Sequence, residues 1–474
     1  MIADTVVADQ APASTRNWAG THLIADPARL ARPRTLEELR TLVRSRSGPI
    51  RILGARLSCP DLLDARPVLA VDLTGLSGVT AWSPARVTAW AGTTLATLNA
   101  ALGRRGQRVD ASPPVIATQT IAGAIATGTH GQGLRQSTIG DAVTALWVMD
   151  GAGDIRKVTE DDPDIGGYSM HLGALGVVVK VELRTVPNQT YVCERTCVDA
   201  DDLVSAFTMA AADSEFAKAW WFPADRVAHI WRLRPATAAE ARLHLGGPGT
   251  ATPLGARDSS INYVVDGLVR KLSTDTRTAA GGRPQFLTVE RFRDFHDSVG
   301  DAHGILCKGI PVPQINCEIG IPLASMDAAH AELSRWYEEH APRMHYPFIL
   351  RATGPSRAWM SPAYDEPTLH YGTVVYLPER GPCAQDAMDA LDDVQSILAR
   401  HDGVPHLGKY FNPQVFGLVA RPSVQRFTAL RDRLSTRHWL PSDYLDSILI
   451  HSPAEGGHGG QPDQVRGRRG GGAH

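Results

Sequence analysis

The stretch Gln119–Gly133, QTIAGAIATGTHGQG, constrains the fold of this chain more than any other segment. It holds four glycines among small residues, and its one ionisable side chain is His130. Glycine accepts positive φ angles and lets another group approach the backbone closely. Backbone N–H groups exposed in such turns bind anions such as a pyrophosphate. Composition alone leaves a second interpretation open, in which the stretch is a tightly packed strand and turn without a ligand.

The overall composition is that of an ordinary globular chain. With 474 residues, 43% hydrophobic and 21% charged, it is long enough for two or three domains. A net charge of −2 and a pI of about 6.8 indicate neither a nucleic acid nor an acidic membrane surface as a partner. No apolar run has the length of a membrane span, and the N-terminus lacks the pattern of a secretory signal. The six cysteines lack the paired spacing of a metal site, so we expect reduced thiols in the cytoplasm and no bound metal.

Local patterns predict mixed α/β structure up to residue 187. Thr35 followed by Glu38 predicts a capping box at the start of a helix. Residues 142–158 read as a hairpin around the turn Asp-Gly-Ala-Gly, and residues 177–187 alternate like a strand. This first part of the chain suits a single nucleotide-binding domain.

From Asn188 the pattern changes to strands that alternate with two amphipathic helices. The helices are expected at 326–342 and 384–403, and strand-like runs include INCEIGIP and TLHYGTVVY. An antiparallel sheet covered by helices is the α+β arrangement that such a pattern predicts.

Three further motifs place the glycine-rich stretch in a family context. They are RILGARLS at 51–58, HLGALGVVVKVELRTVP at 171–187 and HLGK at 406–409. With QTIAGAIATGTHG, they resemble the vanillyl-alcohol-oxidase-type flavoproteins, within them the aldonolactone and alditol oxidase branch. The resemblance runs from about residue 17 to about 449. It implies an α+β, two-domain FAD-binding fold of PCMH type with an antiparallel-sheet cap domain.

The resemblance also implies a domain plan. It comprises a loose arm at 1–16, the FAD-binding domain at 17–187 and the substrate or cap domain at 188–408. A segment at 409–452 returns to the first domain, and the low-complexity end at 453–474 is expected to be disordered.

The cofactor implied by the resemblance is FAD, held by three glycine-containing segments. The residues expected to contact it are Gly54, Ala55, Arg56, Leu57, Ser58, Thr120, Gly123, Gly128, Thr129, His130, Gly131, Gly133, Gly173, Gly176 and Val177. The family attaches FAD covalently through a histidine at the position of Leu57, and leucine cannot form that bond. A thioether to Cys59 is an alternative, but its position is offset by two residues. We therefore expect non-covalent FAD.

A second departure from the family lies in the cap. The family has Glu-x-Arg followed by a Trp-Leu-Ser-Pro-Ala-Tyr motif, whereas this chain has Ile349-Leu350-Arg351 before Trp359. The resemblance gives the missing glutamate a role in binding a substrate hydroxyl. Its loss favours a substrate that is less polyol-like, because buried hydroxyls discriminate through their partners. Glu318 aligns with a structural strand glutamate, so that role is not transferred to it.

The expected substrate-binding residues are Thr120, Ile349 and Arg351. Arg351 and Lys409, one of six lysines in the chain, would place positive charge near the flavin or the substrate. His370 and His406 are the candidates to accept a proton as hydride leaves, and a purely structural role stays open for each.

These residues favour an FAD-dependent oxidoreductase that takes a hydride from a C–H bond next to oxygen or nitrogen. A specialised sugar-like or biosynthetic intermediate is the expected substrate, with O₂ or another electron acceptor. Two alternatives stay open: an ordinary alditol or aldonolactone oxidase, and a flavoprotein that keeps FAD for structure, a non-redox step or ligand binding.

Overall fold

The structure is a computed structural model of the chain. It describes residues 16–18, 23–58, 62, 64, 68–254, 296–307, 314–340, 342, 347–376 and 385–450. Apart from Arg16, the predicted arm at 1–16 lies outside the described residues, as do the tail at 453–474 and Cys59. Among the described residues, no helix combines the length and hydrophobicity that crossing a membrane requires.

A small parallel sheet and one helix open the first domain. The sheet order is β1–β3–β2, with β1 at Leu30–Ala31, β2 at Ile50–Leu53 and β3 at Leu69–Asp72. Helix α1, Leu36–Ser45, begins after Thr35, whose hydroxyl accepts the Glu38 N–H at 3.1 Å, as predicted. The predicted capping box is wrong in its second half, because the Glu38 carboxylate accepts from the Arg34 N–H at 2.7 Å.

The second sheet of this domain is antiparallel and carries most of its core. Its order is β4–β5–β9–β7–β8, with β6 paired to β9. The strands are β4 Val79–Ser83, β5 Arg86–Trp90, β6 Gln107–Val109, β7 Val143–Met149, β8 Ile155–Thr159 and β9 Val177–Pro187. The helices are α2 Leu95–Gly103, α3 Ile121–Ala126 and α4 Ile165–Tyr168. The predicted hairpin, β7 with β8, and the alternating strand β9 are confirmed.

The second domain is a nine-stranded antiparallel sheet with helices, as the α+β pattern predicts. Its order is β13–β14–β10–β12–β11–β16–β17–β15–β18. The strands are β10 Thr190–Asp199, β11 Phe216–Phe222, β12 Val227–Pro235, β13 Ala251–Leu254, β14 Asp297–Asp301, β15 Gln314–Pro322, β16 Phe348–Thr353, β17 Thr368–Tyr376 and β18 Val404–Pro405. The helices are α5 Leu203–Asp213, α6 Ala238–Ala241, α9 Ala302–Leu306, α10 Met326–His340 and α11 Gln385–Ala399.

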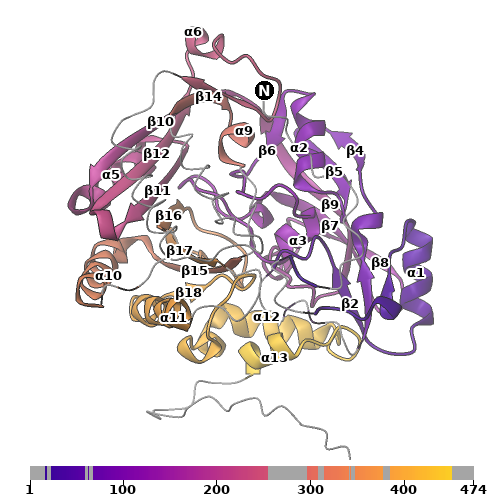
Figure 1. The fold of residues 1–474 in the computed structure, drawn as a ribbon. Helices are drawn as coiled ribbons and strands as arrows, with labels where there is room; N and C mark the ends of the chain where they lie inside the picture. The colour runs from indigo at the N-terminus through magenta and orange to yellow at the C-terminus, as the bar shows by residue number, and fades with distance from the viewer. Residues whose placement is uncertain are drawn as a thin grey trace, which may run out of the picture.

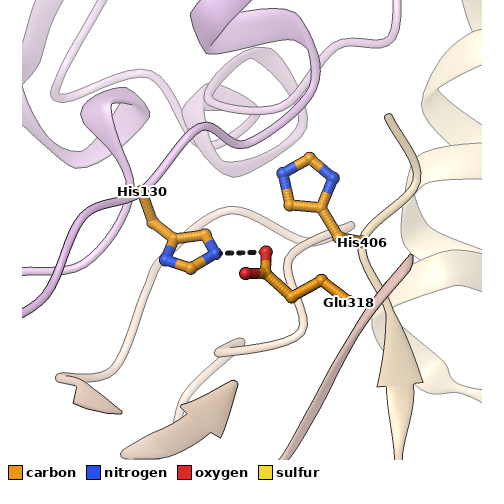
Figure 2. Close-up of side chains that lie close together, drawn as sticks. All are labelled: His130, Glu318 and His406. Carbon is orange, nitrogen blue, oxygen red and sulfur yellow. Dashed lines mark hydrogen bonds and ion pairs between the residues drawn. The ribbon is translucent and has the colours of Figure 1, made fainter. Parts of the chain in front are cut away.

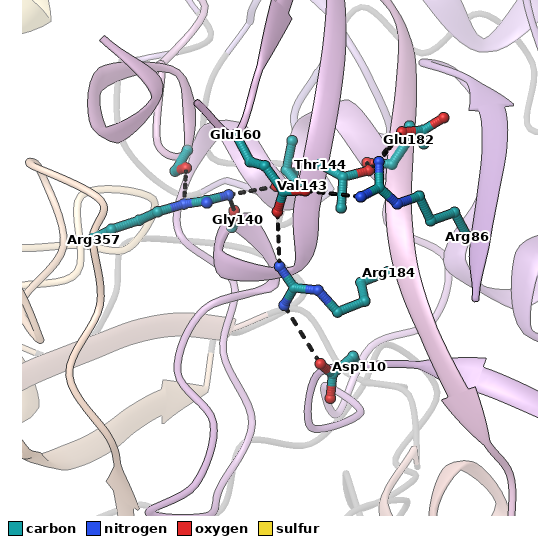
Figure 3. Close-up of polar contacts among 10 residues, drawn as sticks. Arg86, Asp110, Gly140, Val143, Thr144, Glu160, Glu182, Arg184 and Arg357 are labelled. Atoms are coloured by element: carbon teal, nitrogen blue, oxygen red, sulfur yellow. Dashed lines mark hydrogen bonds and ion pairs between the residues drawn. The ribbon is translucent and has the colours of Figure 1, made fainter. Parts of the chain in front are cut away.

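The two domains lie side by side, with the purple first domain and the magenta-to-orange cap on opposite sides of Figure 1. Arg357, in the loop between β16 and β17, joins them. Its guanidinium donates to the carbonyl oxygens of Gly140 and Val143 at 3.1 and 2.5 Å (Figure 3). Its backbone N–H also donates to the Asp141 carboxylate at 2.9 Å. Several bonds from one arginine hold this cap loop against the first domain.

The C-terminal helices α12, Pro422–Arg433, and α13, Asp443–Ile450, lie below both domains in Figure 1. The residues around them pack back on the first domain. The Trp439 carbonyl accepts the Ile50 N–H at 2.9 Å, and the Thr436 hydroxyl donates to the Ala174 carbonyl at 2.5 Å. Residues 436–439 therefore hydrogen-bond to the first domain next to two of the glycine-containing motifs.

Candidate active site

A cavity of about 250 Å³, partly open to solvent, lies where the two domains meet. Its lining comes from the loop after β2, from α3 and the turn after it, from residues 171–178, and from β15, β16 and β17. Eleven of the predicted cofactor residues line it: Gly54, Ala55, Arg56, Leu57, Ser58, Thr120, Gly123, Thr129, His130, Gly173 and Gly176.

The loop at 54–58 and the start of α3 approach each other so closely that glycine is required. A Cβ on Gly54 would lie 2.3 Å from the Thr120 hydroxyl oxygen. That hydroxyl caps α3 by accepting the Gly123 N–H at 3.3 Å. Arg56 adopts a left-handed φ of 59°, which curls the loop. These are the features of a backbone cradle for an anionic group.

Four predicted cofactor residues are not among those that line the cavity: Gly128, Gly131, Gly133 and Val177. Gly133 instead joins the domains, because its N–H donates to the Ala352 carbonyl at 2.8 Å. It has a φ of 135°, and a Cβ there would lie 2.3 Å from the Glu215 carbonyl. Gly131 packs on Ser112 in the same close way. Gly131 and Gly133 are needed for close packing of the turn. The sequence pattern alone does not distinguish this role from contact with a ligand.

Two neighbouring rows of the cap sheet contribute Glu318, Ile349 and Arg351 to the cavity lining. In one row Glu318 on β15 lies opposite Gly372 on β17, which lies opposite Ile349 on β16. In the next row Arg351 is opposite His370. Residues two apart on a strand share a face, so both rows point the same way. Thr120, Ile349 and Arg351, the predicted substrate-binding residues, all line the cavity.

Glu318 is the centre of a buried cluster of charges. Its Oε1 lies 2.9 Å from His130 Nε2 and 2.8 Å from Lys409 Nζ, and its Oε2 lies 3.3 Å from the Arg351 guanidinium. Figure 2 shows His130 and Glu318 pointing toward each other, with His406 beside them. The glutamate side chain is 1% exposed. The prediction that Glu318 is merely a structural strand residue is therefore incomplete, because its side chain organises the site.

Two polar neighbours of Glu318 were also missed. Gln314 and Asn316 line the cavity from the same strand. The available signal was the alternation of polar side chains at every second position of a strand that is otherwise apolar.

The electrostatics of the cluster keep Glu318 ionised. Burial alone would raise the pKa of its carboxyl, but Lys409 and His130 hold that pKa well below its ordinary value. Burial, aided by Lys409, lowers the pKa of His406 to about 3. His406 Nδ1 accepts the Gly408 N–H at 3.1 Å, so its proton is on Nε2. A neutral histidine with its acceptor nitrogen occupied is a poor proton acceptor, which argues against the predicted role of His406 as a base.

His370, the other predicted proton acceptor, is not among the residues that line the cavity. It stacks on His130 with ring centroids 3.9 Å apart, and its Nε2 lies 2.9 Å from the Thr353 hydroxyl. Burial and the neighbouring His130 hold its pKa well below the ordinary value. Its position behind His130 corrects the prediction, because a residue that does not reach the cavity cannot take a proton from a substrate.

The nitrogen and oxygen atoms of His130, Glu318 and His406 lie within 4.8 Å of one another, as three metal ligands would. However, Lys409 and Arg351 already contact the two Glu318 oxygens. A divalent cation would be placed against two positive side chains at hydrogen-bond distance, so we assign no metal to this cluster.

Comparison with known proteins identifies the family. Residues 181–448 match the family described as D-arabinono-1,4-lactone oxidase, and residues 27–159 match the FAD binding domain. The chain belongs to the D-arabinono-1,4-lactone oxidase family. Its first domain is an FAD-binding domain, which agrees with the cofactor expected from the glycine motifs.

The relatives of this family differ in how much of the chain they cover. D-arabinono-1,4-lactone oxidase of Yarrowia lipolytica is 29% identical over 50% of the chain and 45% of its own length. The chain therefore spans about half the length of such fungal relatives. L-gulono-1,4-lactone dehydrogenase of Mycobacterium tuberculosis is 24% identical over 91% of the chain and 98% of its own length. Among solved structures, cholesterol oxidase from Brevibacterium sterolicum superposes with a TM-score of 0.69 at 14% identity, covering 92% of this chain and 96% of that one. The fold is the two-domain FAD-binding fold of PCMH type.

The cavity fits FAD on its own features. The first domain contributes small residues and a loop that is curled at Arg56, which suit a diphosphate. The cap contributes Arg351 and Lys409 at the other domain's wall, where a reactive ring and a substrate would meet.

Proposed function

We propose that this chain is an FAD-dependent oxidoreductase. Its reaction removes a hydride from a C–H bond next to oxygen or nitrogen in a specialised sugar-like small molecule. The observation that carries the proposal is that one cavity is lined by both domains. The glycine loops of the FAD-binding domain form one part of its lining, and Arg351 of the cap and Lys409 of the turn at 406–409 form another part.

Bound FAD supplies the acceptor for the hydride and its electron pair, which pass on to O₂ or another acceptor. The chain's own residues prepare the site. Glu318 anchors the Lys409 ammonium and the Arg351 guanidinium, so both cations are held without a substrate. Charges fixed in advance stabilise negative charge that develops in the reaction. The backbone supports this arrangement, because the His406 N–H donates to the Glu318 carbonyl at 2.9 Å.

We further propose that FAD is bound without a covalent link. The position at which the family carries its linking histidine is Leu57, which lines the cavity and has no nucleophilic atom. Acid precipitation of the yellow holoprotein should release the flavin into the supernatant. Colour that stays with the precipitate would contradict non-covalent binding.

The substrate we propose is a specialised sugar-like or biosynthetic intermediate and not a free alditol or aldonolactone. Ile349 supports this, because it lines the cavity at the position where the family resemblance implies a glutamate, and its side chain cannot accept a hydrogen bond from a hydroxyl. A buried hydroxyl left without a partner costs about 1–3 kcal/mol. The names of the relatives support the rival, a lactone substrate, and efficient oxidation of a gulonolactone or arabinonolactone would favour it.

The decisive experiment is anaerobic reduction of the bound flavin, followed by loss of its visible absorbance. A panel of sugars, sugar acids, sugar phosphates, lactones and amines is mixed with the holoenzyme. Arg351→Met and Lys409→Met should slow reduction by an active compound about 100-fold or more, from the roughly 2.7–4 kcal/mol that a lost oxyanion-type donor costs. Their FAD content should stay close to that of the unmodified protein.

Lys157→Met is the matched control, because Lys157 is exposed and stacks on Trp147 away from the cavity. It should reduce at the normal rate. If no compound bleaches the flavin, the proposal fails in favour of a structural or non-redox role for FAD. If the two cavity variants lose FAD but reduce normally, Arg351 and Lys409 are structural residues.

A further inference from the structure

The hydrogen bonds around His130 determine its protonation. Its Nδ1 lies 3.0 Å from the Gly131 carbonyl oxygen, which can only accept, so Nδ1 carries a hydrogen. Its Nε2 lies 2.9 Å from Glu318 Oε1. In a neutral ring Nε2 would then present a lone pair to the carboxylate. A second proton is needed between the two atoms.

That proton belongs to the histidine. Glu318 also receives Lys409 at 2.8 Å and Arg351 at 3.3 Å, and both contacts favour its ionised form. His130 is therefore an imidazolium ion that donates from both nitrogens. It lines the cavity but is itself 7% exposed, so the charge is held in the wall.

The cluster then carries excess positive charge. Three cations, His130, Arg351 and Lys409, surround one carboxylate, which leaves a net charge of +2. Among the described residues that line the cavity, Glu318 is the one acidic side chain. Buried charge without a counter-charge is costly in free energy, so a bound anion would be favoured here.

Arg351 offers a free binding group for such an anion. Its Nε is buried without a hydrogen-bond partner among the described residues, although the residue is 9% exposed and lines the cavity. The next position on the same face of its strand is Ile349, which adds no compensating negative charge. An oxidised flavin ring is neutral, and the loop at 54–58 of the other domain would hold the diphosphate of FAD. The excess charge is thus left for the substrate.

Resting on the proposed function, we infer that the substrate is an anionic sugar-like compound. Its carboxylate or phosphate group binds Arg351 and Lys409 beside the His130–Glu318 pair. The inference names the substrate class of the same site and separates this chain from enzymes for neutral polyols and lactones.

The test compares three ligands that share a six-carbon polyol chain: D-gluconate, sorbitol 6-phosphate and sorbitol. Each is titrated into the oxidised holoenzyme while the flavin absorption spectrum and the heat of binding are recorded. At least one anion should bind about 10-fold or more tightly than sorbitol, since hydrogen bonds to charged groups contribute roughly 1.5–3 kcal/mol. The preference should shrink as salt is added. Comparison of the affinities for gluconate and sorbitol 6-phosphate shows whether the site prefers a carboxylate or a phosphate group.

Variants locate the effect. Arg351→Gln and Lys409→Met should each remove most of the anion preference, whereas Lys157→Met should retain it. His130→Gln should weaken the preference too, because it removes one positive charge while keeping a donor. FAD content is measured first, and only variants that retain FAD are compared. An unchanged preference in His130→Gln would overturn the protonated state assigned to His130.

Equal affinity for all three ligands would overturn the inference. The outcome is independent of the proposed function, which is tested by flavin reduction. If neutral donors reduce the flavin and anions bind no more tightly, the protein is an oxidoreductase of neutral substrates and only the further inference is wrong. If the protein prefers anions but no donor reduces its flavin, it is an anion-binding flavoprotein, and the proposed function is wrong.

Discussion

Replacing Glu318 with glutamine should destabilise the folded protein severely, although the two side chains are nearly the same size. The carboxylate is 1% exposed and contacts three cationic groups. The amide keeps the volume but removes the negative charge, so His130, Arg351 and Lys409 are left facing one another. Removing one partner from a buried ion pair costs about 3–5 kcal/mol.

The chain provides a matched control. Glu332 also bonds an arginine and a histidine, Arg400 and His401, but it lies at the surface with 29% of its side chain exposed. Exposed ion pairs contribute about 0–1 kcal/mol. Glu332→Gln should therefore leave stability nearly unchanged.

The assay is thermal unfolding of both holoproteins, followed by circular dichroism and by the fluorescence of released flavin. A loss of about 3–5 kcal/mol should lower the apparent midpoint of Glu318→Gln by roughly 3–5 °C, with Glu332→Gln within about 1 °C of the unmodified protein. Equal midpoints for the two variants would refute the reasoning, because Glu318 would then not be the counter-ion of the buried cations.

Three further outcomes are expected. Gly133→Ala should lower the apparent unfolding midpoint more than Gly78→Ala, because both have positive φ but only Gly133 faces a carbonyl, at 2.3 Å; equal losses would contradict a close-approach role. The folded-state pKa of His406 is about 3 against an ordinary 6.5, so its contribution to stability is present above pH 6.5 and lost as the pH falls toward 3. At pH 5 the loss in the free energy of unfolding is about 2 kcal/mol. The unfolding midpoint of His406→Asn should therefore fall less between pH 7.5 and 5 than that of the unmodified protein. Ile349→Glu adds a carboxylate to the row of Glu318, so spectral titration should show weaker gluconate binding and tighter sorbitol binding; an unchanged ratio would remove Ile349 from substrate selection.

Local patterns were sufficient for several helices and strands, and the family resemblance supplied the cofactor. The helix after Thr35, the hairpin of β7 and β8 and the alternating strand β9 depend on caps, turns and a period of two, which neighbouring residues specify. FAD was predicted from the family resemblance that the glycine motifs carry, whereas the residues themselves indicated only curved backbone and close approach. The same reasoning could not separate Gly54, which lines the cavity, from Gly133, which joins the domains, because both uses demand glycine.

The charge cluster was decided only by the tertiary structure. Glu318 meets His130 from 188 residues away, Lys409 from 91 and Arg351 from 33. No local period links these positions; they meet because β15 pairs with β17, β17 pairs with β16, and the turn at 406–409 hydrogen-bonds back to β15. The same packing buries His370 behind His130 and occupies the acceptor nitrogen of His406. The sequence supplied the ionisable side chains, but their protonation depends on burial and on which partners the fold brings within hydrogen-bond distance.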